Sequence, residues 1–281
     1  YLIRLLQDRF NVATLSRGYK RETNEFVLAN NSTTVKEIGD EPFQFFTKFP
    51  KIKVAVDANR INGITQLLKL GSKPDVILLD DAFQHRKVKA GFYILLTTYS
   101  ELFCDDFILP FGNLREPSSG KKRANMIIVT KCPFDISELA MSEIKMKLEV
   151  DVPVFFSKIQ YDELVYSEIE PIKTSEIQQT EKTIITGIAK PFPFISHLKK
   201  ENDLVLQFSD HHNFTEKEID NIKKVSKNKA IITTEKDYMR LKGSLSKEQL
   251  FYLPIKSVFL KDADVLDKII LDYVGKSSRN G

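Results

Sequence analysis

The residues with the clearest chemical potential follow a short apolar run. Val76–Leu79 leads directly into Asp80 and Asp81, and then into Gln84, His85 and Arg86. In open α/β sheets, ligands bind beyond the carboxyl ends of the strands. An apolar strand that ends in Asp is one way in which nucleotide-dependent enzymes hold Mg²⁺ near the transferring phosphate. A single Asp would more simply cap the strand, but the doublet and its polar neighbours favour a metal and phosphate site.

Two further segments place charged side chains at the starts of predicted helices. Asp40 and Glu41 follow a glycine, in a position where the helix dipole favours carboxylates for structural reasons alone. Arg115 and Glu116 stand side by side in the Pro- and Gly-containing loop 109–117, between a strand and a helix. Loops at this edge of a sheet often carry functional residues. A helix cap and a surface salt bridge are the simpler alternatives for the two segments.

Two of the four histidines, His211 and His212, stand together after a predicted strand. A zinc site would need further His or Cys at ligand spacing, which the sequence does not offer. An exposed position at a helix start explains His212, whereas His211 is the better candidate for an oriented acid–base partner. Cys104 and Cys132 form neither a metal pattern nor a disulfide framework, and both are expected to be small buried apolar residues.

Continuous apolar runs of four or five residues alternate with helical patterns along the chain. Such runs are typical of strands buried on both faces of a sheet. Strands are expected at 11–16, 53–56, 76–79, 93–97, 126–130, 154–156, 183–188, 204–208, 230–233 and 257–260. Helices are expected at 1–10, 41–49, 59–70, 115–124, 136–148, 193–199, 216–225 and 264–274. This order predicts an α/β protein with a doubly wound, mostly parallel sheet and a second, smaller α/β domain.

The boundaries of these domains follow from a change in composition. Residues 160–182 are rich in Glu, Gln, Ile and Thr and only weakly periodic, so we interpret them as a linker. The core domain is then expected at 1–159 and the smaller C-terminal domain at 183–281. Tyr1 lies inside the first helical pattern, with no capping residue ahead of it, which predicts that further residues precede it.

Composition narrows the class of partner. The net charge of +4 is mild, and the basic residues are scattered among the acids. A nucleic-acid-binding surface is therefore not indicated, because it would gather basic residues with interleaved aromatics. The balance suits phosphorylated ligands or an anionic lipid surface. No apolar run approaches the ~18 residues that a membrane-spanning helix needs.

A glycine-rich phosphate-binding loop is missing from the sequence. None of its glycines begins the pattern Gly-x-x-x-x-Gly-Lys-Ser/Thr. If the chain acts on ATP, the loop that holds the phosphates has to come from outside these residues.

Taken together, the polar segments resemble those of the tetraacyldisaccharide 4'-kinase family, which phosphorylates the lipid A precursor. The matching segments keep a consistent order and spacing and cover nearly the whole chain: Thr14–Arg21, Gly39–Pro42, Leu79–Arg86, Gly112–Pro117, Val129–Lys131, Thr186–Ile188, Asp210–His212 and Thr233–Asp237. Ala82 stands where the common pattern has Gly. The resemblance implies a P-loop NTPase-like fold. In that family, a Gly-Gly-Thr-Gly-Lys-Thr-type loop stands immediately before a helix, and Tyr1–Phe10 looks like the remainder of that helix.

The resemblance also implies roles for the site residues. Asp40 looks like the general base for the sugar hydroxyl, paired with His211 across the cleft between the domains. A hinge in the linker would then close the second domain onto Asp40. Asp80 and Asp81 would hold Mg²⁺, with Glu41 as a helper. Arg115, Glu116 and His85 would line the site, and the expected phosphate contacts are Arg17, Arg21, Arg60 and Arg86.

The resemblance implies two substrates, ATP and an acylated glucosamine disaccharide 1-phosphate. It also implies that the protein acts as a monomer at the cytoplasmic face of the bacterial inner membrane. Membrane contact would be peripheral, with the main anchor in the missing N-terminal segment. Two alternatives stay open. The chain could be an inactive fragment that binds substrate without turnover, or a kinase that acts on a soluble small molecule.

Overall fold

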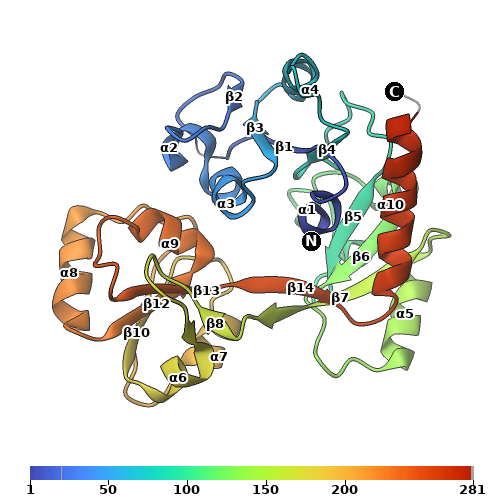
Figure 1. Cartoon of the computed structure of the whole chain (residues 1–281). Helices are drawn as coiled ribbons and strands as arrows, with labels where there is room; N and C mark the ends of the chain where they lie inside the picture. Colours follow the sequence, from blue (N-terminus) through green and yellow to red (C-terminus); the bar gives the residue numbers. More distant parts are fainter. Residues whose placement is uncertain (20, 280–281) are drawn as a thin grey trace.

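The computed structural model describes residues 1–19 and 21–279. Lys20, which belongs to one of the motifs quoted above, and the last two residues lie outside this description. The chain forms two α/β units, and the paired strands β7 (Val154–Tyr161) and β14 (Ile255–Phe259) run between them (Figure 1). Within the described residues, no helix is both long enough and apolar enough to cross a membrane.

The first unit contains two four-stranded sheets. One has the strand order β2-β3-β1-β4 and the other the order β14-β7-β6-β5. Pairing is parallel except for β2 with β3 and β14 with β7. The strands are β1 (Val12–Ser16), β2 (Val27–Leu28), β3 (Lys53–Val56), β4 (Val76–Leu79), β5 (Ile94–Thr98), β6 (Met126–Thr130), β7 (Val154–Tyr161) and β14 (Ile255–Phe259).

Helices cover both faces of these sheets. They are α1 (Leu2–Leu6), α2 (Val35–Ile38), α3 (Asp40–Lys48), α4 (Arg60–Leu68), α5 (Glu138–Leu148) and α10 (Ala263–Arg279), with short 3₁₀ turns η1 (Phe103–Asp105) and η2 (Ser118–Arg123). Side chains of α1 and α10 form one apolar cluster with β1, β3, β6 and β7, so this cluster joins the two sheets. The opposite faces are covered by α4 on β1 and β3 and by α5 on β6 and β7. The five consecutive buried residues of β1 agree with a strand covered on both faces.

A cavity of about 850 Å³ lies between β4 and β5, which are the terminal strands of their sheets. Its apolar part is lined by side chains of both strands, of α1 and of α10. Its polar end reaches Asp80, Asp81 and Arg115. The cavity thus connects the start of α1 with the carboxyl end of β4.

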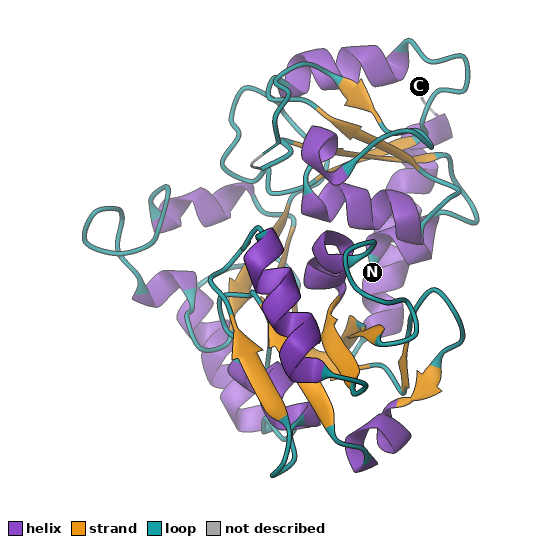
Figure 2. Ribbon diagram, turned by 90° about the vertical axis from the view of Figure 1, so that its left-hand side faces the viewer, coloured by secondary structure: helices purple, strands orange, loops and turns teal. Residues whose placement is uncertain are grey.

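The second unit is a parallel four-stranded sheet of order β11-β10-β12-β13 between two layers of helices. Figure 2, in which this unit faces the viewer, shows its strands between helices. One face of the sheet packs against α6 and α7, and the other face packs against α8 and α9. The elements are β8 (Leu164–Val165), β9 (Ile172–Lys173), α6 (Thr174–Gln179), β10 (Lys182–Thr186), α7 (Phe192–Leu198), β11 (Leu204–Gln207), α8 (Glu216–Ser226), β12 (Ala230–Thr234), α9 (Glu235–Leu241) and β13 (Leu250–Leu253).

Two parts of the predicted domain division differ from the structure. The predicted linker 160–182 is largely part of the second unit, because Val165 and Ile177 are buried in its core. The end of the predicted C-terminal domain belongs to the first unit, since β14 pairs with β7 and α10 packs beside α1. Local periodicity identified this strand and helix but carried no information on their distant partners. The 3₁₀ turn η2 also replaces the longer helix that was expected at 115–124.

Candidate active site

The two units meet at Asp40, the first residue of α3. Its Oδ2 atom lies 3.2 Å from Nδ1 of His211, which comes from the loop after β11. Gly39 has a φ of 86°, and a Cβ atom there would lie 3.1 Å from the carbonyl oxygen of Tyr19. The turn that delivers Asp40 therefore depends on glycine. His211 itself has a φ of 55°, an uncommon backbone conformation that often occurs at functional sites.

Arg240 of α9 also binds Asp40 and was not predicted from the sequence. Its Nε and Nη2 atoms donate to Oδ2 of Asp40, with Nε at 3.1 Å. Its Nη1 atom donates to Oδ1 of Asp237 at 3.2 Å. Asp237 is fully buried and also accepts hydrogen bonds from the backbone N of Gly187 and the hydroxyl of Thr234. The guanidinium is thus fixed from the second unit and presented to the first.

This arrangement sets the protonation state of Asp40. Burial raises the pKa of its carboxyl group, but the hydrogen bond and charge of Arg240, followed by those of His211, outweigh burial and hold the pKa below its usual value. Asp40 is therefore ionised at neutral pH and able to accept a proton. The same charges that keep it ionised also make it a weaker base.

Nδ1 of His211 lies near both Asp40, to which it can only donate, and Arg240, from which it can only accept. With a proton on Nδ1, the ring donates to Asp40; without one, Nδ1 accepts from Nη2 of Arg240, which lies 3.3 Å away. The interaction with Asp40 requires the Nδ1–H tautomer or the protonated ring. In the other tautomer the ring would bind Arg240 of its own unit and lose its hydrogen bond to Asp40 of the first unit.

A cluster of acidic residues, Asp80, Asp81 and Glu41, lies around the end of β4. Asp80 receives a hydrogen bond from the hydroxyl of Ser16, 3.4 Å away, at the end of β1. Burial, and then the negative charges of Glu41 and Asp81, raise the pKa of Asp80. A cation at this place would relieve the repulsion, so the donor set fits a divalent metal such as Mg²⁺.

The three predicted metal ligands are not equally available. Asp81, which has a φ of 43°, forms a two-pronged ion pair with Arg115. Glu41 forms an ion pair with Lys236 of α9. Within residues 1–19 and 21–279, no three acidic, His or Cys side chains come together as a complete metal site. Asp80 is therefore the best placed of the three, and water and phosphate oxygens would have to complete the coordination of a Mg²⁺ ion.

The predicted basic contacts divide into buried and exposed groups. Arg60 is 2% exposed, and its Nη2 atom donates to the carbonyl oxygens of Asp80 and Asp81 at 2.8 and 3.0 Å. It fixes the backbone at the end of β4 in this way. Burial, and then the charge of Arg17, lower the pKa of Arg60. Arg17 is exposed, so its guanidinium is open to a phosphate group that arrives from solvent.

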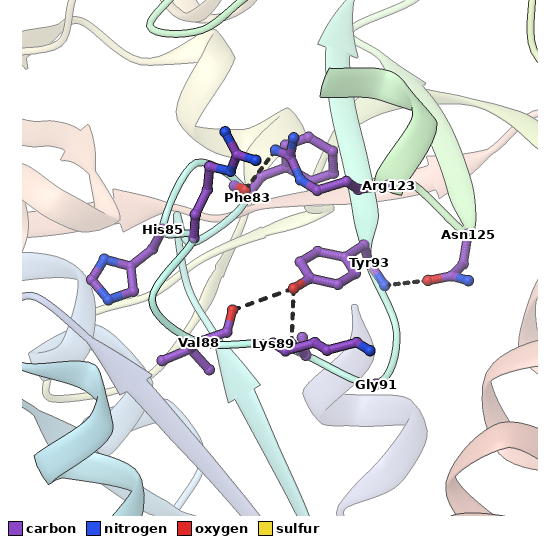
Figure 3. A pocket seen from close by; sticks show the side chains of 10 residues that line it. Phe83, His85, Val88, Lys89, Gly91, Tyr93, Arg123 and Asn125 are labelled. Carbon is purple, nitrogen blue, oxygen red and sulfur yellow. Dashed lines mark hydrogen bonds between the residues drawn. The ribbon is translucent and has the colours of Figure 1, made fainter. Parts of the chain in front are cut away.

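Glu116 and His85 lie beside the loop that follows β4. Glu116 forms an ion pair of 2.7 Å with Arg123, whose guanidinium covers the ring of Phe83. His85 lines a cavity of about 520 Å³ together with Arg86 and Arg123 (Figure 3). Burial, and then the charge of Arg60, lower the pKa of His85, which favours the neutral ring at neutral pH. Arg86 is exposed.

Comparison with known proteins identifies the family of the chain. Residues 1–274 match the family model described as Tetraacyldisaccharide-1-P 4'-kinase. The chain belongs to this family. A Tetraacyldisaccharide 4'-kinase of Flavobacterium psychrophilum is 56% identical over 285 residues, covering 100% of this chain and 83% of the relative. That of Flavobacterium johnsoniae is 54% identical over 276 residues, covering 98% of this chain and 81% of the relative.

A solved structure of the family supports the predicted fold class. The "apo" form of LpxK from Aquifex aeolicus in complex with ATP has a TM-score of 0.76 and 28% identity, covering 98% of this chain and 82% of that one. The sequence-based assignment to the tetraacyldisaccharide 4'-kinase family and to an α/β fold with mostly parallel sheets is thereby confirmed.

Arg240 could have been found from its spacing in the sequence. The family segment Thr233–Asp237 ends in an acid, and Arg240 follows three residues later, where i and i+3 side chains of a helix are neighbours. The sequence did not reveal that this pair faces Asp40, some 200 positions away.

Replacing Arg240 with Gln should raise the pKa of Asp40, because the largest favourable interaction with the carboxylate is lost. We expect the acidic limb of the pH–rate profile to move to higher pH, while Arg240→Lys moves it less. Lys229→Gln, which removes a partly exposed cation paired with Glu181, is the matched control. An acidic limb that stays in place in Arg240→Gln would show that Asp40 does not control this part of the profile.

Proposed function

We propose that the protein transfers the γ-phosphate of ATP to the 4'-hydroxyl of an acylated glucosamine disaccharide 1-phosphate in lipid A biosynthesis. The observation that carries the proposal is the pairing of Asp40 with His211, 3.2 Å apart, next to the acidic end of β4. The names of the matching family and of the relatives agree with this reaction.

In the proposed mechanism, Asp40 accepts the proton of the attacking hydroxyl. Its pKa is held low, so the carboxylate is ready to act over the neutral range. His211 orients it by donating from Nδ1, and Arg240 binds the same carboxylate from the second unit. Phosphoryl transfer needs this kind of positioning and charge stabilisation more than covalent chemistry.

Asp80 would hold Mg²⁺, with Asp81 and Glu41 nearby, and the ion when bound would neutralise charge on the phosphates. Arg17 and Arg86, both exposed, are proposed to contact phosphate oxygens directly. Arg60 supports the site by holding the two carbonyl groups at the end of β4. Arg115, Glu116 and His85 would line the approach of the substrates.

The phosphates of ATP are proposed to lie at the polar end of the cavity between β4 and β5. The family resemblance implies a strand and a phosphate-binding loop just ahead of α1, and Tyr1 and Leu2 line this cavity together with Asp80 and Asp81. A strand entering there would pair with the open edges of β4 and β5 and would end beside the acidic group. The protein is proposed to act as a monomer, in peripheral contact with the cytoplasmic face of the inner membrane.

The test is transfer of labelled phosphate from ATP to a tetraacyl disaccharide 1-phosphate in detergent micelles. The 281-residue chain is compared with a version that carries the N-terminal segment of the Flavobacterium psychrophilum relative. Mg²⁺-dependent transfer by the extended version, lost on chelation of the metal, is the expected result. Transfer to a water-soluble sugar, with no response to the acylated disaccharide, would overturn the choice of substrate.

A further inference from the structure

An exposed apolar cluster lies on the loop that leads to the active site. Phe107, Ile108, Leu109 and Phe111 are 71, 45, 59 and 90% exposed. Single exposed apolar side chains are common on protein surfaces, but four large ones within five consecutive residues form a patch of the kind that marks an interaction site. We call residues 106–114 the apolar loop.

The backbone of the apolar loop is internally hydrogen-bonded. The carboxylate of Asp106 accepts from the backbone N atoms of Phe107 and Asn113 at 2.8 and 3.1 Å. Leu109 and Leu114 are joined by the bond from N of Leu109 to O of Leu114, 3.0 Å long. Leu114 in turn donates to the carbonyl oxygen of Phe107 at 3.0 Å. The loop therefore satisfies much of its own polar backbone and needs little help from water.

Glycine at position 112 is required for this structure. A Cβ atom there would lie 2.2 Å from Oδ1 of Asp106 and 2.3 Å from the carbonyl oxygen of Phe107. The turn is thus tightly closed, and the exposed apolar side chains are held by an ordered backbone. A segment with its peptide groups already paired enters a medium of low polarity at lower cost than an open loop does.

The apolar loop leads directly into Arg115, a residue of the candidate active site. It begins after η1, where Phe103 packs on the core beside α5, and it ends at Arg115, which binds Asp81. The following turn η2 carries the consecutive basic residues Lys121, Lys122 and Arg123, of which Lys122 is exposed. Lys121 and Arg123 pair with Glu149 and Glu116, whereas the exposed Lys122 adds to apolar side chains the positive charge that anionic lipid surfaces attract.

We propose that the apolar loop inserts into the interfacial layer of a bilayer that contains anionic phospholipid, and so brings the Asp81–Arg115 end of the site to the membrane. The proposal rests on the membrane setting given under the proposed function, but not on phosphate transfer. A bilayer suits this surface better than a protein partner does, because a stable protein interface needs about 800 Å² from each side, and the cluster spans only residues 107–111.

The absence of tryptophan from the sequence makes a direct test available. Phe111→Trp places a single fluorophore on the apolar loop, and Phe134→Trp places one at a loop position that is 82% exposed. Both proteins are mixed with vesicles of zwitterionic phospholipid, alone or with anionic phospholipid. We expect a blue shift and quenching by brominated acyl chains for Phe111→Trp on the anionic vesicles, and neither for Phe134→Trp.

Vesicle co-sedimentation gives an independent readout. Phe107→Ser/Phe111→Ser should lower the vesicle partition coefficient at least about tenfold, from the lost burial of two aromatic side chains. Phe134→Ser/Phe192→Ser, which changes two other exposed phenylalanines, should leave it within about twofold. Thermal unfolding checks that both double variants remain folded.

Three results would overturn the proposal: no vesicle binding by the unmodified chain, equal binding by the two double variants, or an unshifted spectrum for Phe111→Trp on vesicles that bind the protein. Self-association that is lost in Phe107→Ser/Phe111→Ser, without any vesicle response, would instead assign the surface to a second copy of the chain. A vesicle response together with no phosphate transfer by the extended version would contradict the proposed reaction and leave the membrane surface standing.

Discussion

Replacing Asp40 with Asn should lower kcat about 10²- to 10⁴-fold, the range usual for loss of a general base. Asparagine keeps the shape of the side chain but cannot accept the proton of the hydroxyl. Because Lys48 still binds Glu235 and Glu41 still binds Lys236 across the two units, the contact between the units should survive. The measurement is steady-state phosphate transfer by the extended chain described above, with KM determined separately from kcat.

Asp8→Asn is the matched control, since Asp8 forms an exposed ion pair with Lys51. It should leave kcat unchanged. A kcat for Asp40→Asn within a few-fold of the unmodified enzyme would exclude Asp40 as the base. A large rise in KM with unchanged kcat would instead assign Asp40 to substrate binding.

The pH dependence of stability gives a second signature of Asp40. Its pKa in the folded protein is lower than its usual value, so the carboxylate stabilises the fold at pH values above the unfolded pKa. This contribution is lost as the pH falls through the folded pKa. Asp40→Asn should therefore flatten the decline of the unfolding midpoint with acidification, relative to the unmodified chain.

The largest effect on stability is expected from Lys182→Met in the second unit. The side chains of Lys182 and Asp203 are 0 and 1% exposed, and Nζ lies 2.7 Å from Oδ2. Removal of the ammonium group leaves a buried carboxylate without its cation, which costs about 3–5 kcal/mol of unfolding free energy. Chemical denaturation followed by circular dichroism measures this loss.

The matched control for Lys182→Met uses a partly exposed pair in the same unit. Lys229 binds Glu181 at 2.8 Å with both side chains partly exposed, so Lys229→Met should cost less than about 1 kcal/mol. Adding Asp203→Asn to Lys182→Met should recover much of the loss, because the amide oxygen can still accept from backbone N of Lys182 while the buried charge is gone. An equal loss of unfolding free energy in the two single Lys variants would show that the buried pair contributes no more to stability than the partly exposed one.

The strands were predictable because their signal is local. The expected strands 53–56, 76–79 and 126–130 coincide with β3, β4 and β6, each a short apolar run bounded by polar residues. The expected helix 1–10 was too long: α1 ends at Leu6, since the turn before β1 leaves no room for further helical residues. Short elements such as β2 have too few residues to show a period at all.

The active site was predictable residue by residue but not as a network. The sequence singled out Asp40 and His211 as separate motifs, and only the family resemblance implied that they meet. Their distance and the role of Arg240 depend on how two units pack, which no local pattern describes. Arg60 illustrates the same limit, because its sequence position does not reveal that it is buried against the backbone of Asp80 and Asp81.

The pairing of β14 with β7 has a consequence for how the protein is made. Tyr161 and Ile255 are partners in that ladder, so the second unit is an insertion whose two ends meet. A ribosome completes this inserted unit before it has synthesised β14 and α10, which the first unit needs for its core. The second unit is therefore expected to fold first during synthesis. The first unit, which carries Asp40, can complete its core only after β14 and α10 have been synthesised.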